Sequence, residues 1–152
     1  MHERKVLGGI VVVVIKKELI DFLVDALLKC YPYEGCGFLL GKKNQNGLEI
    51  FSIYPVENVW SNLEERKRRF AIDPRDYLKA EKTSAELGLE ILGIYHSHPD
   101  YPATPSSFDA DYAWEGYVYL IFSIATDGVK DCRAYIWVNG EGFKEVEIKM
   151  NP

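Results

Sequence analysis

The protein has 152 residues, of which 47% are hydrophobic, 27% charged and 13% aromatic, and its formal net charge is −5. A chain of this length fits one domain with its own apolar core, so we predict a single domain over residues 1–152 that needs no disulfide framework. The acidic balance excludes the basic footprint that is typical of nucleic-acid-binding proteins, and we expect no nucleic acid as a partner.

Cysteine usage and hydropathy bear on where the protein works. Cys30, Cys36 and Cys132 are an odd number without a Cys-x-x-Cys pair, which is typical of a reducing compartment. The apolar run at residues 10–15 is too short for a secretion signal, and no cleavage site follows it. No segment approaches the roughly 20 apolar residues that span a bilayer. We therefore expect a cytoplasmic protein that contacts no membrane.

Apolar patterning predicts the elements of the first half of the chain. Residues 9–15 (GIVVVVI) are β-branched and continuously apolar, as in a buried strand. Residues 16–32 carry apolar side chains at helical spacing and end at a proline, which favours a helix. Two further strands are predicted at residues 34–41 and 48–59, separated by the turn signal NQNG, before an irregular segment that extends to residue 72.

Helix signals become stronger in the middle of the chain. Asp73 is the expected N-cap and Pro74 the first residue of a helix that ends near Gly88. Residues 89–98 then read as a strand, and residues 106 to about 114 as a short helix.

Three strands close the chain, at residues 117–126, 130–138 and 143–149. The pairs Asp127-Gly128 and Asn139-Gly140 are turn signals that link these strands as hairpins. The order β-α-β-β-α-β-α-β-β-β predicts an α/β (α+β) domain in which helices pack on one curved, mixed β-sheet.

Two histidines end the strand at residues 89–98. Side chains alternate faces along a strand, so His96 and His98 point to the same side and form either a bidentate metal site or a hydrogen-bonded pair. Pro99 stops the strand, and Pro102 and Pro105 stiffen the loop that follows.

Ser106 and Asp109 have two compatible interpretations. A serine followed three residues later by an acid is typical of a capped helix N-terminus. A carboxylate in that first turn could also face the strand end that carries the histidines. Two histidines and one carboxylate give zinc three protein ligands and leave a fourth position for water, which is typical of a catalytic site.

The spacing H-x-H-P-x6-S-x2-D, which runs from His96 to Asp109, resembles the signature of the JAMM (MPN-plus) metalloprotease family. The segment YEGCGFLLG at residues 33–41 also resembles the family, as does FAIDPRDYLKAE at residues 70–81, and the resemblance covers roughly residues 30–125. It implies an MPN/JAMM-type, cytidine-deaminase-like fold of the compact prokaryotic kind.

The resemblance implies a role for each of five residues, and none departs from the family pattern. His96, His98 and Asp109 would bind one Zn²⁺ per chain. Glu34 would accept a proton from the water and deliver it to the leaving amine, and Ser106 would donate a hydrogen bond to the oxyanion. Glu34 lies at no fixed spacing from the histidines, and the acids that compete with it are Glu18, Glu49 and Glu57.

The resemblance also implies a substrate class. JAMM enzymes cut after the Gly-Gly tail of ubiquitin or a ubiquitin-like protein, and compact members resemble enzymes that process ubiquitin-like sulfur-carrier proteins. The alternative is a non-catalytic MPN-type module that binds such proteins, although modules of this kind lack the metal ligands. A nucleobase deaminase and an amidohydrolase barrel are excluded, by the missing P-C-x-x-C signature and by chain length. A homodimer stays open.

Three other features carry weaker signals. Cys36 shares the strand face of Glu34, and we interpret it as a buried, inert thiol rather than a nucleophile. The basic run at residues 66–69 is typical of a solvated loop, with docking of an acidic partner as the alternative. Trp60, Trp114 and Trp137 are interpreted as core or edge aromatics.

Overall fold

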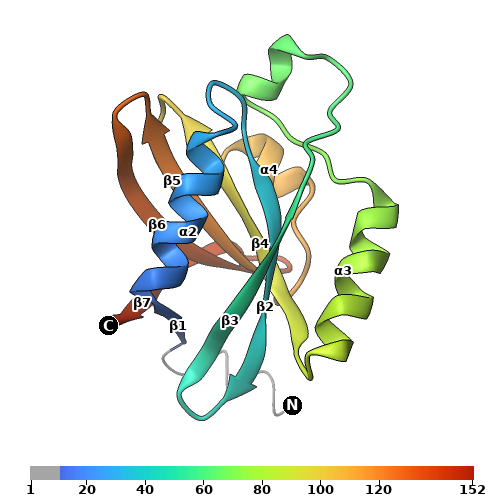
Figure 1. Cartoon of the computed structure of the whole chain (residues 1–152), viewed down its shortest axis with the longest axis vertical. Coiled ribbons are helices and arrows are strands. Elements are labelled where there is room, and N and C mark those ends of the chain that lie inside the picture. Colours follow the sequence, from blue (N-terminus) through green and yellow to red (C-terminus); the bar gives the residue numbers. More distant parts are fainter. Residues whose placement is uncertain (1–10) are drawn as a thin grey trace.

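The computed structural model describes residues 11–152 (Figure 1), so the beginning of the strand predicted at residues 9–15 lies outside the described residues. The predicted order of strands and helices is confirmed, with one added 3₁₀ turn, η1, in the segment predicted as irregular. The elements are β1 (Val12–Lys16), α2 (Lys17–Leu28), β2 (Cys36–Asn44), β3 (Gly47–Val56), η1 (Glu64–Lys67), α3 (Pro74–Glu86), β4 (Glu90–Pro99), α4 (Ser107–Asp111), β5 (Val118–Ala125), β6 (Gly128–Val138) and β7 (Gly142–Asn151).

The seven described strands form one mixed sheet that closes into a barrel, in the order β1-β3-β2-β4-β5-β6-β7. Closure comes from β1, which pairs in parallel with both β3 and β7. The predicted curved, mixed sheet is therefore confirmed, and its curvature continues until the first and last strands meet. The predicted hairpins are also present, since β5 pairs antiparallel with β6 and β6 with β7.

Two helices cover different faces of the sheet and lie on either side of the β2–β3 hairpin (Figure 1). Helix α2 places Leu23 and Leu27 in the main apolar core. Helix α3 packs Ala80 against Phe38 and Leu40, on the opposite face of β2 from the main core. Residues 36–41 of β2 are thus buried on both faces, which explains the continuous apolar sequence of this part of the strand.

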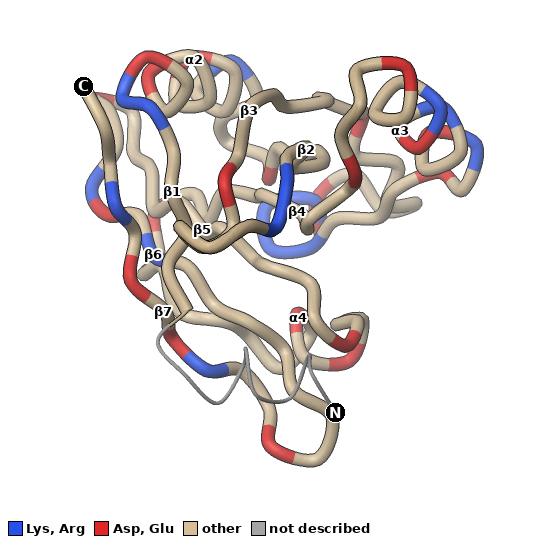
Figure 2. The backbone as a smooth tube through the Cα atoms, turned by 90° about the horizontal axis from the view of Figure 1, so that it is seen from below, with Lys and Arg blue, Asp and Glu red and all other residues tan. Residues whose placement is uncertain are grey.

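Helix α3 begins as predicted, because the side chain of Asp73 accepts a hydrogen bond from the backbone amide of Arg75. Charges of both signs follow one another along this helix (Figure 2), as expected for its solvated face. No helix within residues 11–152 is long and apolar enough to cross a membrane.

Helix α4 is shorter than predicted. It ends at Asp111 rather than near residue 114. The backbone amide of Trp114 donates to the hydroxyl of Tyr119 on β5, at 2.8 Å, instead of to a helix carbonyl. The partner of Trp114 is thus a residue of another element, and helix propensity, which depends on neighbouring residues, cannot predict such a contact.

Strand β4 carries the two motif histidines between β2, which is antiparallel to it, and β5, which is parallel. A bulge at Leu92 interrupts its pairing with β2, because Leu39 pairs with Gly93 while Leu40 pairs with Ile91. Beyond the bulge the pairing is regular up to His96. The bulge therefore decides which face of the sheet the histidines occupy.

Candidate active site

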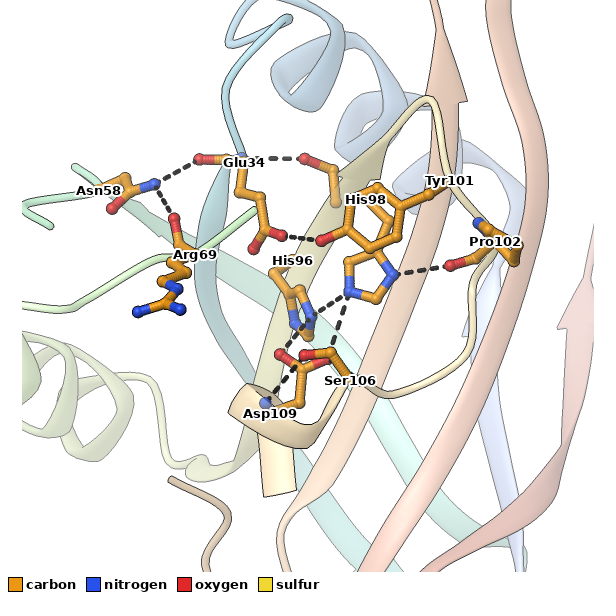
Figure 3. A network of polar contacts seen from close by, with 11 residues as sticks. Glu34, Asn58, Arg69, His96, His98, Tyr101, Pro102, Ser106 and Asp109 are labelled. Carbon is orange, nitrogen blue, oxygen red and sulfur yellow. Dashed lines mark hydrogen bonds and ion pairs between the residues drawn. The ribbon is translucent and has the colours of Figure 1, made fainter. Parts of the chain in front are cut away.

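His96, His98 and Asp109 converge at the end of β4 and the start of α4, and all three are buried (Figure 3). The two imidazole Nε2 atoms are 3.1 Å apart. Asp109 places Oδ1 3.3 Å from Nε2 of His96, and Oδ2 3.3 Å from Nε2 of His98. The three residues therefore form one compact group of metal-ligand type.

Hydrogen bonding decides which atoms of this group carry lone pairs. His98 Nδ1 lies 2.7 Å from the carbonyl oxygen of Pro102, which only accepts, so Nδ1 carries a proton; in the neutral imidazole that binds metals, Nε2 then carries the lone pair. This lone pair faces the carboxylate of Asp109 and Nε2 of His96. Burial lowers the pKa of His96, and the charge of Asp109 acts in the opposite direction. The lowered pKa favours the neutral imidazole, which is the form that binds metals.

The spacing of these donors fits a small divalent metal ion. Donors at tetrahedral angles, each about 2.0–2.1 Å from zinc, lie about 3.3 Å from one another. The two Nε2 atoms are 3.1 Å apart, and each lies 3.3 Å from one oxygen of Asp109, Oδ1 for His96 and Oδ2 for His98. One potential donor atom from each residue lies within 4.8 Å of the other two. A cation among them would also offset the repulsion between facing lone pairs. The predicted group is therefore compatible with a metal ion.

The start of α4 combines both interpretations of Ser106 and Asp109. The backbone amide of Asp109 donates to Oγ of Ser106 at 3.0 Å, and the backbone amide of Ser106 donates to Oδ2 of Asp109 at 2.9 Å. This reciprocal pair is a capping box, with aspartate in place of the more usual glutamate. The same carboxylate that caps the helix faces both histidines, so capping and metal-ligand geometry coexist. The hydroxyl hydrogen of Ser106 stays available to donate.

Glu34 lies just before β2, and its side chain is buried, with the whole residue 1% exposed. Its backbone amide donates to the carbonyl of Arg66 at 2.7 Å, and its carbonyl accepts from the side-chain amide of Asn58 at 3.0 Å. The next residue, Gly35, exchanges hydrogen bonds with Ser97, at 2.9 and 3.1 Å. These contacts fix Glu34 beside the histidines.

The three competing glutamates are not buried, and two of them line a different cavity. Glu18 and Glu57 are exposed, and Glu49 is half-buried. Glu18 and Glu49 line a separate cavity between α2 and β3. Glu34 is thus the buried glutamate that the fold brings toward the metal-ligand group.

The two carboxyl oxygens of Glu34 have different surroundings. Oε2 accepts a hydrogen bond from the hydroxyl of Tyr101 (Figure 3). Oε1 is buried without a hydrogen-bond partner among residues 11–152. Burial raises the pKa of Glu34 to about 9, and the charge of Asp109 adds to this, while the hydrogen bond from Tyr101 acts in the opposite direction. Such a carboxyl group is suited to exchanging protons near neutral pH.

Three residues that position the site were not identified from the sequence. Ser97 lies between the two histidines but on the opposite face of the strand. Its place in H-S-H is the one sequence feature that could have indicated a role in the site. Asn58 links Glu34 to the backbone of Arg69 through long-range hydrogen bonds that leave no local pattern. Tyr101 lies in the loop after Pro99, and no local sequence pattern indicates that an aromatic residue in this loop contacts the site.

An apolar cavity of about 500 Å³ opens beside the metal-ligand group, between α3 and the segment around α4. His96 and Asp109 form part of its lining, and Trp114, which is 56% exposed, lies at its edge. Its other lining side chains include the aromatic residues Phe38, Trp60, Phe70, Tyr77, Phe108, Tyr112, Tyr117 and Tyr119. This cavity can receive an apolar segment of chain whose end reaches the metal-ligand group.

The basic run at residues 66–69 lies next to the site rather than on a remote loop. The guanidinium carbon of Arg69 is 5.5 Å from the ring centroids of both Trp60 and Phe108, a cation–π arrangement on the cavity wall. Cys36 is buried, as expected, and burial raises the pKa of its thiol. The thiol therefore stays protonated, and the interpretation of an inert cysteine agrees with its surroundings.

Comparisons with known proteins agree with the motif. Residues 16–136 match the sequence model described as prokaryotic homologs of the JAB domain. A desampylase from Haloferax volcanii is 33% identical over 78% of this chain and 79% of its own length. A probable TtuB-protein conjugate cleaving protease from Thermus thermophilus is 36% identical over 76% of this chain and 69% of its own length.

Two further similarities span almost the whole chain. A CysO-cysteine peptidase from Mycobacterium tuberculosis is 26% identical over 91% of this chain and 91% of its own length. The solution structure of a protein from Desulfitobacterium hafniense superposes with a TM-score of 0.80 and 28% identity, covering 91% of this chain and 92% of that one. The match to the JAB-domain model confirms the predicted family, and the names of the desampylase, the conjugate-cleaving protease and the CysO-cysteine peptidase confirm the enzyme class.

Proposed function

We propose that this chain, which belongs to the family of prokaryotic homologs of the JAB domain, is a zinc-dependent peptidase that cleaves after the C-terminal Gly-Gly of a ubiquitin-like, sulfur-carrier type of protein. One observation carries this proposal. The buried group of His96, His98 and Asp109 lies beside the buried carboxyl group of Glu34, at one end of an apolar cavity.

Each of the three metal ligands has a defined donor in this proposal. His96 and His98 would bind zinc through Nε2, and Asp109 through a carboxylate oxygen, which leaves one tetrahedral position for water or substrate. When bound, zinc supplies Lewis acidity that lowers the pKa of a water molecule to about 7 and polarises a peptide carbonyl. The hydrogen bond from His98 Nδ1 to the carbonyl of Pro102 orients that imidazole.

Glu34 would transfer the proton, and Ser106 would stabilise the negative charge that develops on the carbonyl oxygen. Oε1 of Glu34, which no other group occupies among residues 11–152, would take the proton from the attacking water and pass it to the leaving amine. Ser106 would donate its hydroxyl hydrogen to the carbonyl oxygen as negative charge develops there, since the cap of α4 uses Oγ only as an acceptor. The overall reaction adds one water across one peptide bond.

The substrate class follows from the relatives and from the cavity. The relatives are named desampylase, probable TtuB-protein conjugate cleaving protease and CysO-cysteine peptidase. An apolar tail segment would occupy the aromatic cavity, while glycines, which have no side chain, would pass most closely to the metal ligands. The basic run at residues 66–69 would then face the body of an acidic carrier protein.

Other partner assignments stay predictions from the sequence. We continue to expect neither nucleic acid nor a membrane as a partner, and a cytoplasmic location for this chain with three unpaired cysteines. A homodimer stays open. The alternative of a non-catalytic binding module is disfavoured, because such a module has no need for convergent, buried metal ligands.

The experiment that tests the proposal uses a ubiquitin-like carrier protein ending in Gly-Gly followed by one extra residue. Zinc-loaded enzyme should release that residue, which intact-protein mass spectrometry detects as a single mass loss. A matched carrier with Ala-Ala in place of Gly-Gly should stay intact, and chelation should stop cleavage until zinc is restored.

The same carrier joined to a lysine side chain distinguishes isopeptide from peptide cleavage. Stoichiometric zinc without cleavage of either substrate, together with tight carrier binding, would favour the binding module. Cleavage that continues in metal-free protein would contradict the zinc mechanism.

A further inference from the structure

The side chain of Tyr101 contacts both the carboxyl group of Glu34 and one of the metal ligands (Figure 3). Its hydroxyl donates a hydrogen bond to Oε2 of Glu34. Its ring stacks on the imidazole of His98, with centroids 4.1 Å apart and planes inclined by 13°. Tyr101 therefore connects two parts of the site that come from distant segments of the chain.

The backbone around Tyr101 is held at several points. Asp100 adopts a positive φ of 65°, which is uncommon for a residue with a side chain, and its backbone amide donates to the carbonyl of Ile124 at 2.7 Å. The side chain of Asp100 accepts from the hydroxyl of Tyr31 at 2.5 Å. Ser123 donates to the carbonyl of Tyr101 itself at 2.6 Å. These contacts keep the turn in a conformation that places Tyr101 over the site.

We propose that Tyr101 is a positioning residue for Glu34, an inference that rests on the proposed function. The hydroxyl of Tyr101 occupies Oε2 of Glu34 and thereby leaves Oε1 as the oxygen that exchanges protons with the reacting groups. The ring, stacked on His98, fixes the hydroxyl at a set place relative to the metal ligands.

The physical reason is the freedom of a glutamate side chain. An untethered carboxyl group samples several rotamers, and only a fraction of them present an oxygen toward the reacting water. One donor on one oxygen therefore selects the productive orientation of the carboxyl group.

A matched pair of variants separates positioning from loop stability. Tyr101→Phe keeps the stacked ring and removes only the hydroxyl that reaches Glu34. Tyr135→Phe is the control, because the hydroxyl of Tyr135 donates to the carbonyl of Ala103 at 2.9 Å, in the same loop but outside the site. If Tyr101 only supported the loop, both variants would behave alike.

The first readout needs no activity. In metal-free protein, the stability of Glu34→Ala, Tyr101→Phe and the double variant is measured by denaturant unfolding. The losses should be non-additive, because each single variant removes the same hydrogen bond. The losses from Glu34→Ala and Tyr135→Phe should add. Additive losses for Glu34 and Tyr101 would overturn the proposal.

The second readout is kinetic, on the extended Gly-Gly carrier. Tyr101→Phe should lower kcat about ten- to hundred-fold with KM and zinc content unchanged, and Tyr135→Phe should keep near-normal kcat. Equal kcat for Tyr101→Phe and wild type would overturn the positioning role while the proposed function stands. If wild type cleaves no extended carrier, the proposed function fails and the inference falls with it.

Discussion

The metal-ligand half of the site and the half around Glu34 are held in place by different kinds of structure. His96 and His98 lie on a strand, and Asp109 lies in the first turn of a helix, so regular hydrogen bonding fixes them. Glu34 lies outside any helix or strand. A hydrogen bond from the side-chain amide of Asn58 and one to the backbone carbonyl of Arg66 fix its backbone.

The difference concerns distance along the chain. The ligands come from residues 96–109, where one strand, one stiff loop and one capped helix determine their spacing. The contacts of Glu34 come from residues 58–66 and 101, and those of the adjacent Gly35 come from Ser97. Local sequence therefore specifies the first half, whereas the second half forms only when these distant segments pack together. Variants in the two halves should fail in different ways.

The largest effect is expected for Asp109→Ala, which removes one of the three proposed zinc ligands. Zinc content should fall from about one per chain to a small fraction, because affinity should drop by more than the roughly 10–100-fold that is typical of residues behind the ligands. Activity should disappear with the metal. Elemental mass spectrometry measures the zinc, and Asp111→Ala, an exposed acid in the same helix, is the control. Full zinc occupancy in Asp109→Ala would mean that Asp109 is only a cap.

Glu34→Ala should affect proton transfer without affecting metal binding. Turnover should fall about 10²–10⁴-fold, the range for loss of a general acid–base group, while zinc content stays at the wild-type level. Single-turnover cleavage of the extended carrier measures the effect. Glu57→Ala, an exposed acid beyond β3, should cleave normally. Near-normal turnover of Glu34→Ala would assign the proton transfer to another group.

Ser106→Ala tests whether one residue serves both purposes. Turnover should fall about 10²–10³-fold if the hydroxyl stabilises the oxyanion, and unfolding free energy should fall by about 0.5–2 kcal/mol through loss of the cap. Asp73→Ala removes the cap of α3 and should lose stability without losing turnover. If the two variants match in both measurements, Ser106 is a cap and nothing more.

The smallest effect is a pH dependence of stability in metal-free protein. The pKa of Glu34 is raised to about 9 from 4.5, so its contribution to stability is present below pH 4.5 and is lost as the pH rises toward 9. Glu34→Gln should therefore gain stability relative to wild type between pH 5 and pH 9. A gain of at least about 1.4 kcal/mol is expected, the equivalent of one unit of pKa, which is roughly 3–6 °C in melting temperature.

Adding zinc provides a second comparison for the pH dependence of stability. A bound cation favours the ionised carboxyl group, so the difference between Glu34→Gln and wild type should depend less on pH when zinc is present. Thermal unfolding at several pH values, with and without zinc, measures both cases. Parallel stability curves for the two metal-free proteins would contradict a raised pKa for Glu34.

Much of the fold is predictable from the sequence because its signals are local. The cap at Asp73 and the two hairpins signalled by Asp127-Gly128 and Asn139-Gly140 depend on neighbouring residues, and all are present in the structure. The turn of the first hairpin lies at residues 126–127, one position earlier than the signal, because Gly128 already pairs with Ala125. The end of α4 was misplaced because a hydrogen bond from Trp114 to Tyr119 ends it. Closure of the barrel through β1 and β7 joins the two ends of the described chain, and no local pattern encodes that pairing.

The site divides in the same way. The sequence by itself determined the metal-ligand group, because strand alternation aligns His96 with His98 and a capping box places Asp109. Only the tertiary structure decided that Glu34, rather than Glu18, Glu49 or Glu57, is buried beside them, and that Tyr101 reaches its carboxyl group. The physical reason is that burial and long-range hydrogen bonds depend on how distant segments pack, whereas periodicity and capping depend on adjacent residues alone.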